Sequence, residues 1–220
     1  MADQKHEKLR VALLLSLGAG YMDGFTFFHF NGRFAGAQTG NIIQAGIALA
    51  RGEFLDFWNF VIPILFFVLG VMVKIFFEHF LQQHRRPSTL YLLLFQLLGL
   101  TAFVLIFILA VPELPAAIVV GVLSFFMAIQ FDTFNKAHGR GYTSVFTTGN
   151  LKILSVNVAQ YLITHEKSHL EYAKLLFWII PCFFVGAFVA TLLVSPFGNW
   201  ALLVNCIDLL IVYIIIRTEA

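Results

Sequence analysis

The segment that decides the fold is residues 20–41, GYMDGFTFFHFNGRFAGAQTGN, where an aspartate in an apolar run precedes a Thr-Gly-Asn tripeptide. The same pattern recurs 109 residues later. Without a gap, Asp23 aligns with Asp132, and Thr39-Gly40-Asn41 aligns with Thr148-Gly149-Asn150. An acid placed sixteen residues before the same tripeptide, twice in one chain, indicates an internal duplication.

The composition of the chain indicates a membrane protein. Of its 220 residues, 60% are apolar and 12% are charged, and the mean hydropathy is +0.86. A soluble domain has about 25% charged residues, so about half of the usual charged surface is missing. A bilayer accepts such a composition because its core is itself apolar.

Six apolar segments have about the 20 residues that a helix needs to cross a bilayer. They lie at roughly 11–30, 57–82, 89–111, 116–138, 172–195 and 200–217. Two other segments, 37–50 and 143–163, are amphipathic and carry the tripeptides at their starts. The helical part of the first, about 41–50, would be only ~15 Å long at 1.5 Å per residue. The sequence therefore predicts two half-helices that enter the membrane without crossing it.

The positions of the basic residues favour six crossings over eight. Lys and Arg collect on the cytoplasmic side of membrane proteins. With six crossings, the basic N-terminus, the loop near 83–88 and the region 136–174 all lie inside, and only Arg33 and Arg51 lie outside. With eight crossings, much of this charge would lie outside. We therefore expect a multi-pass protein of the cell inner (cytoplasmic) membrane with both termini in the cytoplasm.

The expected fold is an all-α polytopic membrane protein with a single domain, 1–220. Repeat 1 covers about 11–111 and repeat 2 about 116–217. Pro63 and its apolar run match Pro181 and its run after a nine-residue insertion. Each repeat has three crossings and one half-helix, and an odd number of crossings places the second unit upside down. The repeats should then be related by a pseudo-two-fold axis in the membrane plane, as in many transporters.

Two inverted half-helices would bring their N-termini together near the middle of the membrane. Exposed N–H groups and the helix dipole make such an end attractive to anionic or hydrogen-bonding solutes. Thr and Asn are good N-cap residues, and Gly permits a tight bend. The alternative is that each tripeptide only starts a helix at an interfacial loop and binds no ligand.

Asp23 and Asp132 lie inside apolar helices, where a charge is costly and usually marks a pathway. One interpretation is proton coupling or cation coordination. The other is that each carboxylate orients the neighbouring broken helix by accepting hydrogen bonds from its N–H groups. The candidate pathway residues are Asp23, Thr39, Gly40, Asn41, Gln44, Gln130, Asp132, Thr148, Gly149 and Asn150.

Other polar and small residues are expected to have structural roles. Gln96 is expected to join helices by hydrogen bonding, and Gly18, Gly20 and Gly24 to permit close helix packing. The chain has no phosphate-binding loop, metal-binding cluster or nucleophile motif. We therefore expect no enzyme activity, no cofactor, no metal and no nucleic-acid binding.

The first block, GYMDGFTFFHFNGRFAGAQTGNIIQAGIALARGEF, resembles the YoaK-type family of bacterial membrane proteins of unknown function. GVLSFFMAIQFDTF followed by TTGN resembles that family's second motif. The resemblance covers essentially the whole chain and implies about six transmembrane helices in a bacterial inner membrane. Asp132-Thr133-Phe134-Asn135 departs from a stretch that is often richer in Asn and Arg in the family. The resemblance implies no substrate.

Three functions are consistent with the sequence. The first is a transporter of a small solute or ion, with proton coupling as an option. The second is a channel lined by the opposed half-helices, and the third is a membrane scaffold that transports nothing. The expected partners are the lipid bilayer and an unidentified small solute or ion, with the formation of homo-oligomers left open.

Overall fold

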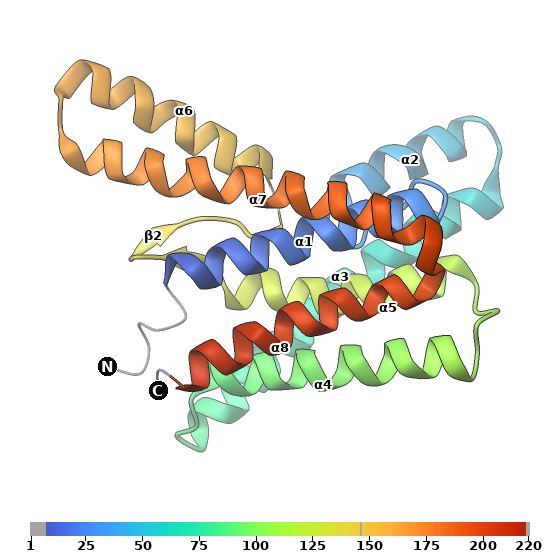
Figure 1. The fold of residues 1–220 in the computed structure, drawn as a ribbon. Helices are drawn as coiled ribbons and strands as arrows, with labels where there is room; N and C mark the ends of the chain where they lie inside the picture. The colour runs from blue at the N-terminus through green and yellow to red at the C-terminus, as the bar shows by residue number, and fades with distance from the viewer. Residues whose placement is uncertain (1–7, 146, 219–220) are drawn as a thin grey trace.

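A computed structural model describes residues 8–145 and 147–218 and shows a nearly all-helical chain (Figure 1). In chain order the elements are α1 Leu9–His29, α2 Gln38–Ala50, α3 Phe54–Gln83, α4 Ser88–Leu109, α5 Ala116–Thr133, β1 Lys136–Ala137, β2 Arg140–Gly141, α6 Thr147–Thr164, α7 Lys167–Phe197, the 3-10 helix η2 Gly198–Leu202, and α8 Leu203–Thr218.

Five helical stretches are long and apolar enough to cross a membrane. Four of them are α1, α3, α4 and α5. The fifth runs over 52 residues from Lys167 to Thr218 and therefore contains both α7 and α8. The chain reverses between these two helices (Figure 1), at Gly198, whose positive φ of 53° suits a residue without a side chain. The start of α1 and the end of α8 lie at the same end of the bundle.

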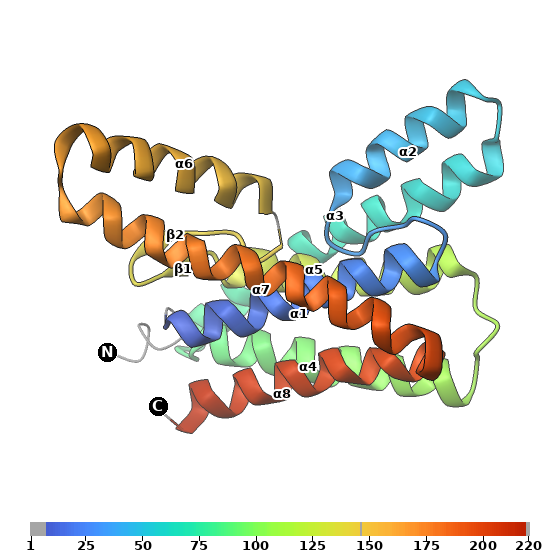
Figure 2. The same cartoon turned by 45° about the horizontal axis from the view of Figure 1, so that its top comes forward.

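The two tripeptides lie in the short helices α2 and α6, neither of which is among the candidate spans. Helix α2 has 13 residues and packs on α3, while α6 packs on α7. Figure 2 shows α2 and α6 on the same side of the bundle, at opposite ends of it, with their N-terminal ends towards the middle. The first half-helix was expected to begin near residue 41, but α2 begins three residues earlier, at Gln38.

Glycines allow the backbones of neighbouring helices to touch in two extensive contacts, α1 with α7 and α3 with α5. A side chain on Gly20 or Gly24 of α1 would overlap the backbone of Phe183 or Ala187 in α7. In the contact between α3 and α5, a side chain on Gly70 would overlap the backbone oxygen of Phe125. The expected packing role of Gly20 and Gly24 is thus confirmed. Gly18 differs, because its nearest neighbours are side chains of α8.

The end of the fourth apolar segment differs from the expected 116–138. Helix α5 ends at Thr133, and the chain then forms a hairpin in which β1 pairs antiparallel with β2. His138 and Gly139 make its two-residue turn, both with positive φ. Such turns match the natural twist of two strands. The expected all-α fold therefore needs one correction, since the chain also forms two strands of two residues each.

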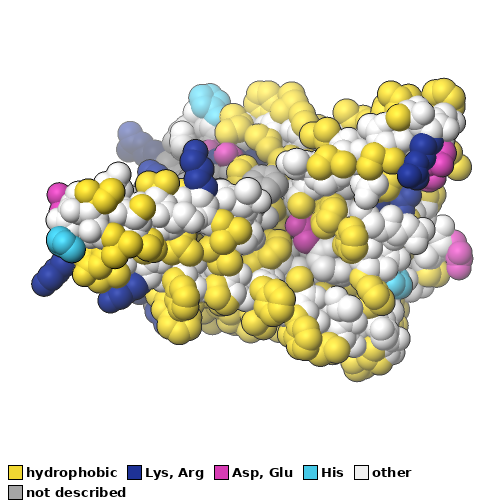
Figure 3. Space-filling model, turned by 90° about the horizontal axis from the view of Figure 1, so that it is seen from above, with side chains coloured by type: hydrophobic (Ala, Val, Ile, Leu, Met, Phe, Trp, Pro, Cys, Tyr) yellow, Lys and Arg dark blue, Asp and Glu magenta, His cyan; other side chains and the backbone are white. Residues whose placement is uncertain are grey.

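The surface carries many large apolar side chains. Examples are Phe54, Leu55, Phe76 and Phe184, each at least 66% exposed. In the view from above (Figure 3), hydrophobic side chains extend along the face, and the visible Lys and Arg lie towards its two ends. An apolar surface with basic ends is what contact with a lipid bilayer requires.

Candidate functional site

The two loops that precede α2 and α6 touch each other. A side chain on Gly36, in the first loop, would overlap Cγ1 of Val145 in the second loop. Gly36 and Val145 are 109 residues apart, the same offset that aligns the two tripeptides. The two loops therefore meet at positions that the 109-residue alignment pairs with each other.

The asparagine of each tripeptide braces its own loop. Asn41 accepts a hydrogen bond from the Phe34 N–H at 3.0 Å and donates to the Phe34 carbonyl at 2.7 Å. Asn150 accepts from the Thr143 N–H at 2.9 Å and donates to the Thr143 carbonyl at 2.6 Å. Phe34 and Thr143 are again 109 residues apart. In both loops, one asparagine side chain thus satisfies both backbone groups of a loop residue.

This arrangement corrects the expected capping role of the first tripeptide. The N-cap of α2 is Ala37, and no side chain caps that end. Asn41 lies inside the first turn and points back to the loop. Thr39 and Thr148 are exposed on their helices. Gly40 gives room to the Phe34 ring, which a side chain there would overlap.

Gly149 and Gln44 take no part in these contacts. The atom nearest to a side chain added at Gly149 is Oγ1 of Thr143, at 3.8 Å, which is an ordinary contact distance. Gln44 is partly buried on α2. The structure therefore brings together only part of the predicted set.

Asp23 holds the first loop from α1. Its Oδ1 accepts hydrogen bonds from the N–H groups of Gly36 at 2.6 Å and Ala37 at 3.4 Å. Thr26, one turn further on, accepts from the Ala35 N–H at 3.2 Å. Asp23 is buried, and its Oδ2 has no hydrogen-bond partner. These are the contacts expected of a carboxylate that orients the entry to a broken helix.

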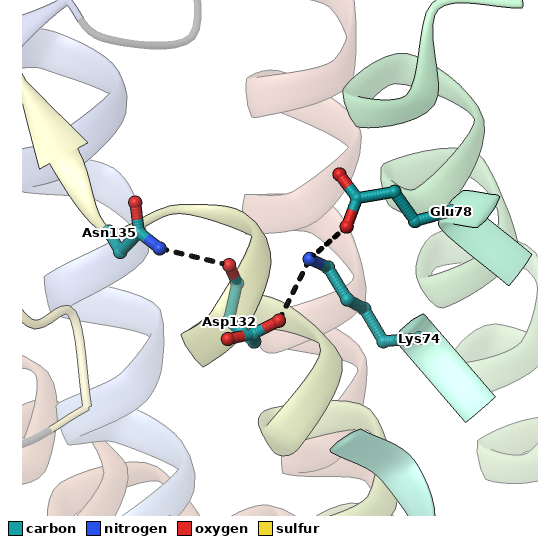
Figure 4. A network of polar contacts seen from close by, with 4 residues as sticks. All are labelled: Lys74, Glu78, Asp132 and Asn135. Atoms are coloured by element: carbon teal, nitrogen blue, oxygen red, sulfur yellow. Dashed lines mark hydrogen bonds and ion pairs between the residues drawn. The ribbon is translucent and has the colours of Figure 1, made fainter. Parts of the chain in front are cut away.

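Asp132 has a different environment, shown in Figure 4. Its Oδ2 lies 2.8 Å from Nζ of Lys74 on α3, and the same nitrogen lies 2.6 Å from Glu78. The close contact of α3 with α5 at Gly70, one turn earlier, brings Lys74 within reach. Its backbone carbonyl accepts a hydrogen bond from Nδ2 of Asn135 at 3.2 Å, whereas its carboxylate bonds to no described residue of the second loop. The loop-orienting contact, one of the two interpretations given for these acids, is thus seen at Asp23 and not at Asp132.

Glutamines connect the helices around the loops. Gln130 of α5 donates to the Leu15 carbonyl of α1 at 3.0 Å and accepts from Gln96 of α4 at 3.2 Å. Gln38, at the start of α2, donates to Ser124 of α5 at 3.3 Å. The expected role of Gln96 as a link between helices is confirmed. Gln130 has the same kind of role in this structure.

Sequence reasoning missed three functional candidates. Lys74 is a buried cation in an apolar helix, and the expected pathway residues do not include it. Asp208 and Asn205 on α8 are also buried, and each has an oxygen without a hydrogen-bond partner. The rule that singled out Asp23, an acid inside an apolar run, applies equally to Asp208 in NCIDLL.

Two further ionisable groups lie in the loops. Arg33 is buried, donates to the carbonyls of Phe30 at 2.9 Å and Asn59 at 3.2 Å, and lies over the Phe60 ring. Burial lowers the pKa of its guanidinium, and Asp56 opposes this shift. In the second loop, burial raises the pKa of the Tyr142 phenol. Arg33 thus ties the first loop to α3, whereas the buried Tyr142 hydroxyl has no hydrogen-bond partner among the described residues.

No group of three His, Cys, Asp or Glu that could hold a metal ion occurs in residues 8–145 and 147–218. A pocket of about 300 Å³ lies beside the hairpin, lined by His138, Arg140, Glu171 and Leu175 rather than by the tripeptides. The chemistry available at the meeting point of the loops is hydrogen bonding and charge, supplied by backbone N–H groups, amides and carboxylates.

Replacing either bracing asparagine by alanine should destabilise the protein by a similar amount. Asn41→Ala and Asn150→Ala each leave a loop N–H and carbonyl without their partners, which costs about 1–3 kcal/mol per buried group. Asn59→Ala, which removes one exposed hydrogen bond to Asp56, is the control. Thermal unfolding in detergent measures the effect. Equal melting temperatures for Asn41→Ala and Asn59→Ala would contradict the bracing role.

Comparison with known proteins gives a family but no function. No curated protein and no solved structure matches the chain. The likeness to YoaK-type proteins stays a prediction from the motifs. A family model matches residues 11–215, nearly the whole chain. The chain therefore belongs to the family described as protein of unknown function (DUF1275).

Proposed function

We propose that the protein transports a small solute or ion across the cytoplasmic membrane, through alternating access around the meeting point of the two loops. The observation that carries the proposal is the contact of Gly36 with Val145, equivalent positions of the two copies. Irregular backbone inside a membrane is tolerated only where it is buried in protein or lines an aqueous path. Transporters place their sites at such discontinuous helices.

The helices of the structure fit six membrane crossings. Helices α7 and α8 count as two crossings because the chain reverses at Gly198 between them. Helix α2 is ~20 Å long at 1.5 Å per residue, too short for a ~30 Å core. With the basic residues on the cytoplasmic side, both termini are cytoplasmic. The first loop is then reached from outside and the second from inside.

An inverted repeat is supported by the pattern of helix packing. Under this repeat α1, α2, α3 and α4 correspond to α5, α6, α7 and α8. Helix α1 packs on α7, and α5 packs on α3. Helix α2 packs on α3, and α6 on α7; α1 packs on α8, and α5 on α4. Each of these three contacts has its counterpart with the two copies exchanged. Such symmetry allows two states in which the copies exchange their conformations.

The test begins with a search for the transported compound. Amino acids, organic acids and inorganic ions are screened for those that raise the melting temperature of the purified protein, since a ligand of the folded state stabilises it. Uptake of each active compound is then measured in proteoliposomes. Saturation with concentration supports a carrier. Flux that rises linearly supports the channel alternative, and no flux of any bound compound counts against transport.

Gly36→Val should reduce uptake to background while the protein remains folded. The added side chain occupies the position of Val145 and pushes the two loops apart. Gly46→Val is the matched control, because Gly46 is a glycine of α2 with no atom within 4 Å of an added side chain. Uptake and melting temperature are measured for both. Full uptake by Gly36→Val would mean that the path does not pass between the loops.

A further inference from the structure

Asp208 lies on the face of α8 that packs against α1. A side chain on Gly18 would overlap its Oδ2, and the same position lies 3.1 Å from Nδ2 of Asn205. Asn205 donates from that nitrogen to the Gly18 carbonyl at 2.8 Å. The absence of a side chain at Gly18 therefore makes room for an acid and an amide, one helical turn apart, against the backbone of α1.

The Asp208 carboxylate has no compensating charge. Its Oδ2 is buried without a hydrogen-bond partner, and so is Oδ1 of Asn205. No Lys, Arg or His of the described chain forms an ion pair with it, and the residue is only 7% exposed. The other two acids differ, because Asp23 accepts two backbone hydrogen bonds and Asp132 pairs with Lys74.

The neighbouring elements supply few charges. Helix α8 packs on α1, α4 and η2. The titratable side chains on these elements and on α8 itself are Arg10, Tyr21, Asp23, His29, Tyr91, Cys206, Tyr213 and Arg217. None of them bonds to Asp208. Tyr21 donates to the Ala201 carbonyl, and His29 bonds to Asn199.

A bare carboxylate in such a place costs several kcal/mol and is neutralised by a proton or a bound cation. Ca²⁺ takes 6–8 oxygen ligands and Mg²⁺ a complete octahedron. Here only two buried oxygens lack partners, Oδ2 of Asp208 and Oδ1 of Asn205. So few free oxygens suit a proton, which needs only one oxygen to bind, better than a metal ion.

We propose that Asp208 is a proton-binding site that exchanges its proton during transport and couples uptake to the pH gradient. The carboxylate takes up one proton to become the neutral acid and returns it as the carboxylate when water reaches α8 from the other side. Asp23 and Asp132 then serve to position the loops and helices. The coupling role rests on the proposed transport function, whereas the proton site itself does not.

Reaction with dicyclohexylcarbodiimide, which modifies protonated carboxyls in apolar surroundings, tests the site without a known solute. The full chain in detergent is treated between pH 6 and pH 9, and the modified residue is identified by peptide mass spectrometry. We expect modification at Asp208 that decreases as the pH rises. Asp208→Asn should abolish it, Asp208→Glu should restore it, and Asp23→Asn should leave it in place. Gel filtration confirms that each variant is folded.

The inference is overturned if Asp208 is not modified at any pH, or if modification falls mainly on Asp23 or Asp132. It is also overturned if Na⁺ at constant pH protects Asp208, because the site would then bind a cation. In proteoliposomes, Asp208→Asn should carry solute without any response to the pH gradient. Modification of Asp208 in a protein that moves no solute would retain the proton site and remove the transport proposal, so the two failures are distinguishable.

Discussion

Gly20→Val should prevent stable folding, with a loss of more than about 3 kcal/mol, above the usual cost of overpacking a core. The atoms nearest to a side chain at this position are the oxygen, carbonyl carbon and Cα of Phe183, all backbone atoms of α7. A backbone cannot rotate aside as a side chain can. The contact between α1 and α7 would have to open along its length, and with it the support of both loops.

Matched variants separate close packing from the intrinsic effect of losing a glycine. In Gly46→Ala the added methyl group has no neighbouring atom within 4 Å, and the change removes a glycine from the interior of α2. It should therefore leave the stability of the protein unchanged or raise it by about 0.5–1 kcal/mol. Gly186→Val, which meets the Leu17 carbonyl from the α7 side, should be as damaging as Gly20→Val. Yield of monodisperse protein and melting temperature in detergent measure the series. A Gly20→Val protein as stable as Gly46→Ala would refute backbone contact between the two helices.

The helices could be predicted from the sequence because the membrane leaves little choice. Backbone groups in lipid must be paired within the segment, so apolar length alone locates a helix. The segment expected at 89–111 is observed as Ser88–Leu109, and that expected at 57–82 as Phe54–Gln83. The turn at Gly198 also follows from the gap between the last two apolar segments. Helix ends in the second loop were less predictable, because the hairpin depends on local turn residues rather than on hydropathy.

The contacts of the site could be predicted only in part. The recurrence of Thr-Gly-Asn located both loops, and the equal spacing gave Asp23 and Asp132 the same two candidate roles. Spacing within one copy, however, says nothing about a partner from another helix. Lys74 reaches Asp132 across the contact between α3 and α5, whereas no Lys or Arg among residues 8–145 and 147–218 pairs with Asp23. The role of Asn41 was also missed, since propensity favours a cap where the structure has a brace to a residue seven positions earlier.

Lys74→Ala is expected to cost about 2–4 kcal/mol. Removing one member of a buried ion pair typically costs about 3–5 kcal/mol, and the lower range applies because the Asp132 and Glu78 side chains are 31% and 29% exposed. Two carboxylates that now share one ammonium would face each other without it. Lys152→Ala, an exposed lysine of α6, is the control and should change stability little. Unfolding in detergent measures both.

A double-mutant cycle assigns this loss to the pair rather than to the lysine side chain. If Asp132 depends on Lys74, then Lys74→Ala with Asp132→Ala should cost less than the sum of the single changes, with a coupling of about 0.5–3 kcal/mol. Simple additivity would contradict the network. The result also bears on the two copies. Asp23 is held by its own loop and Asp132 by another helix, so the first loop should keep its position in Lys74→Ala while α5 loosens from α3. Protection of amide hydrogens against exchange, lost around Asp132 and kept around Gly36, is the expected signature of that difference.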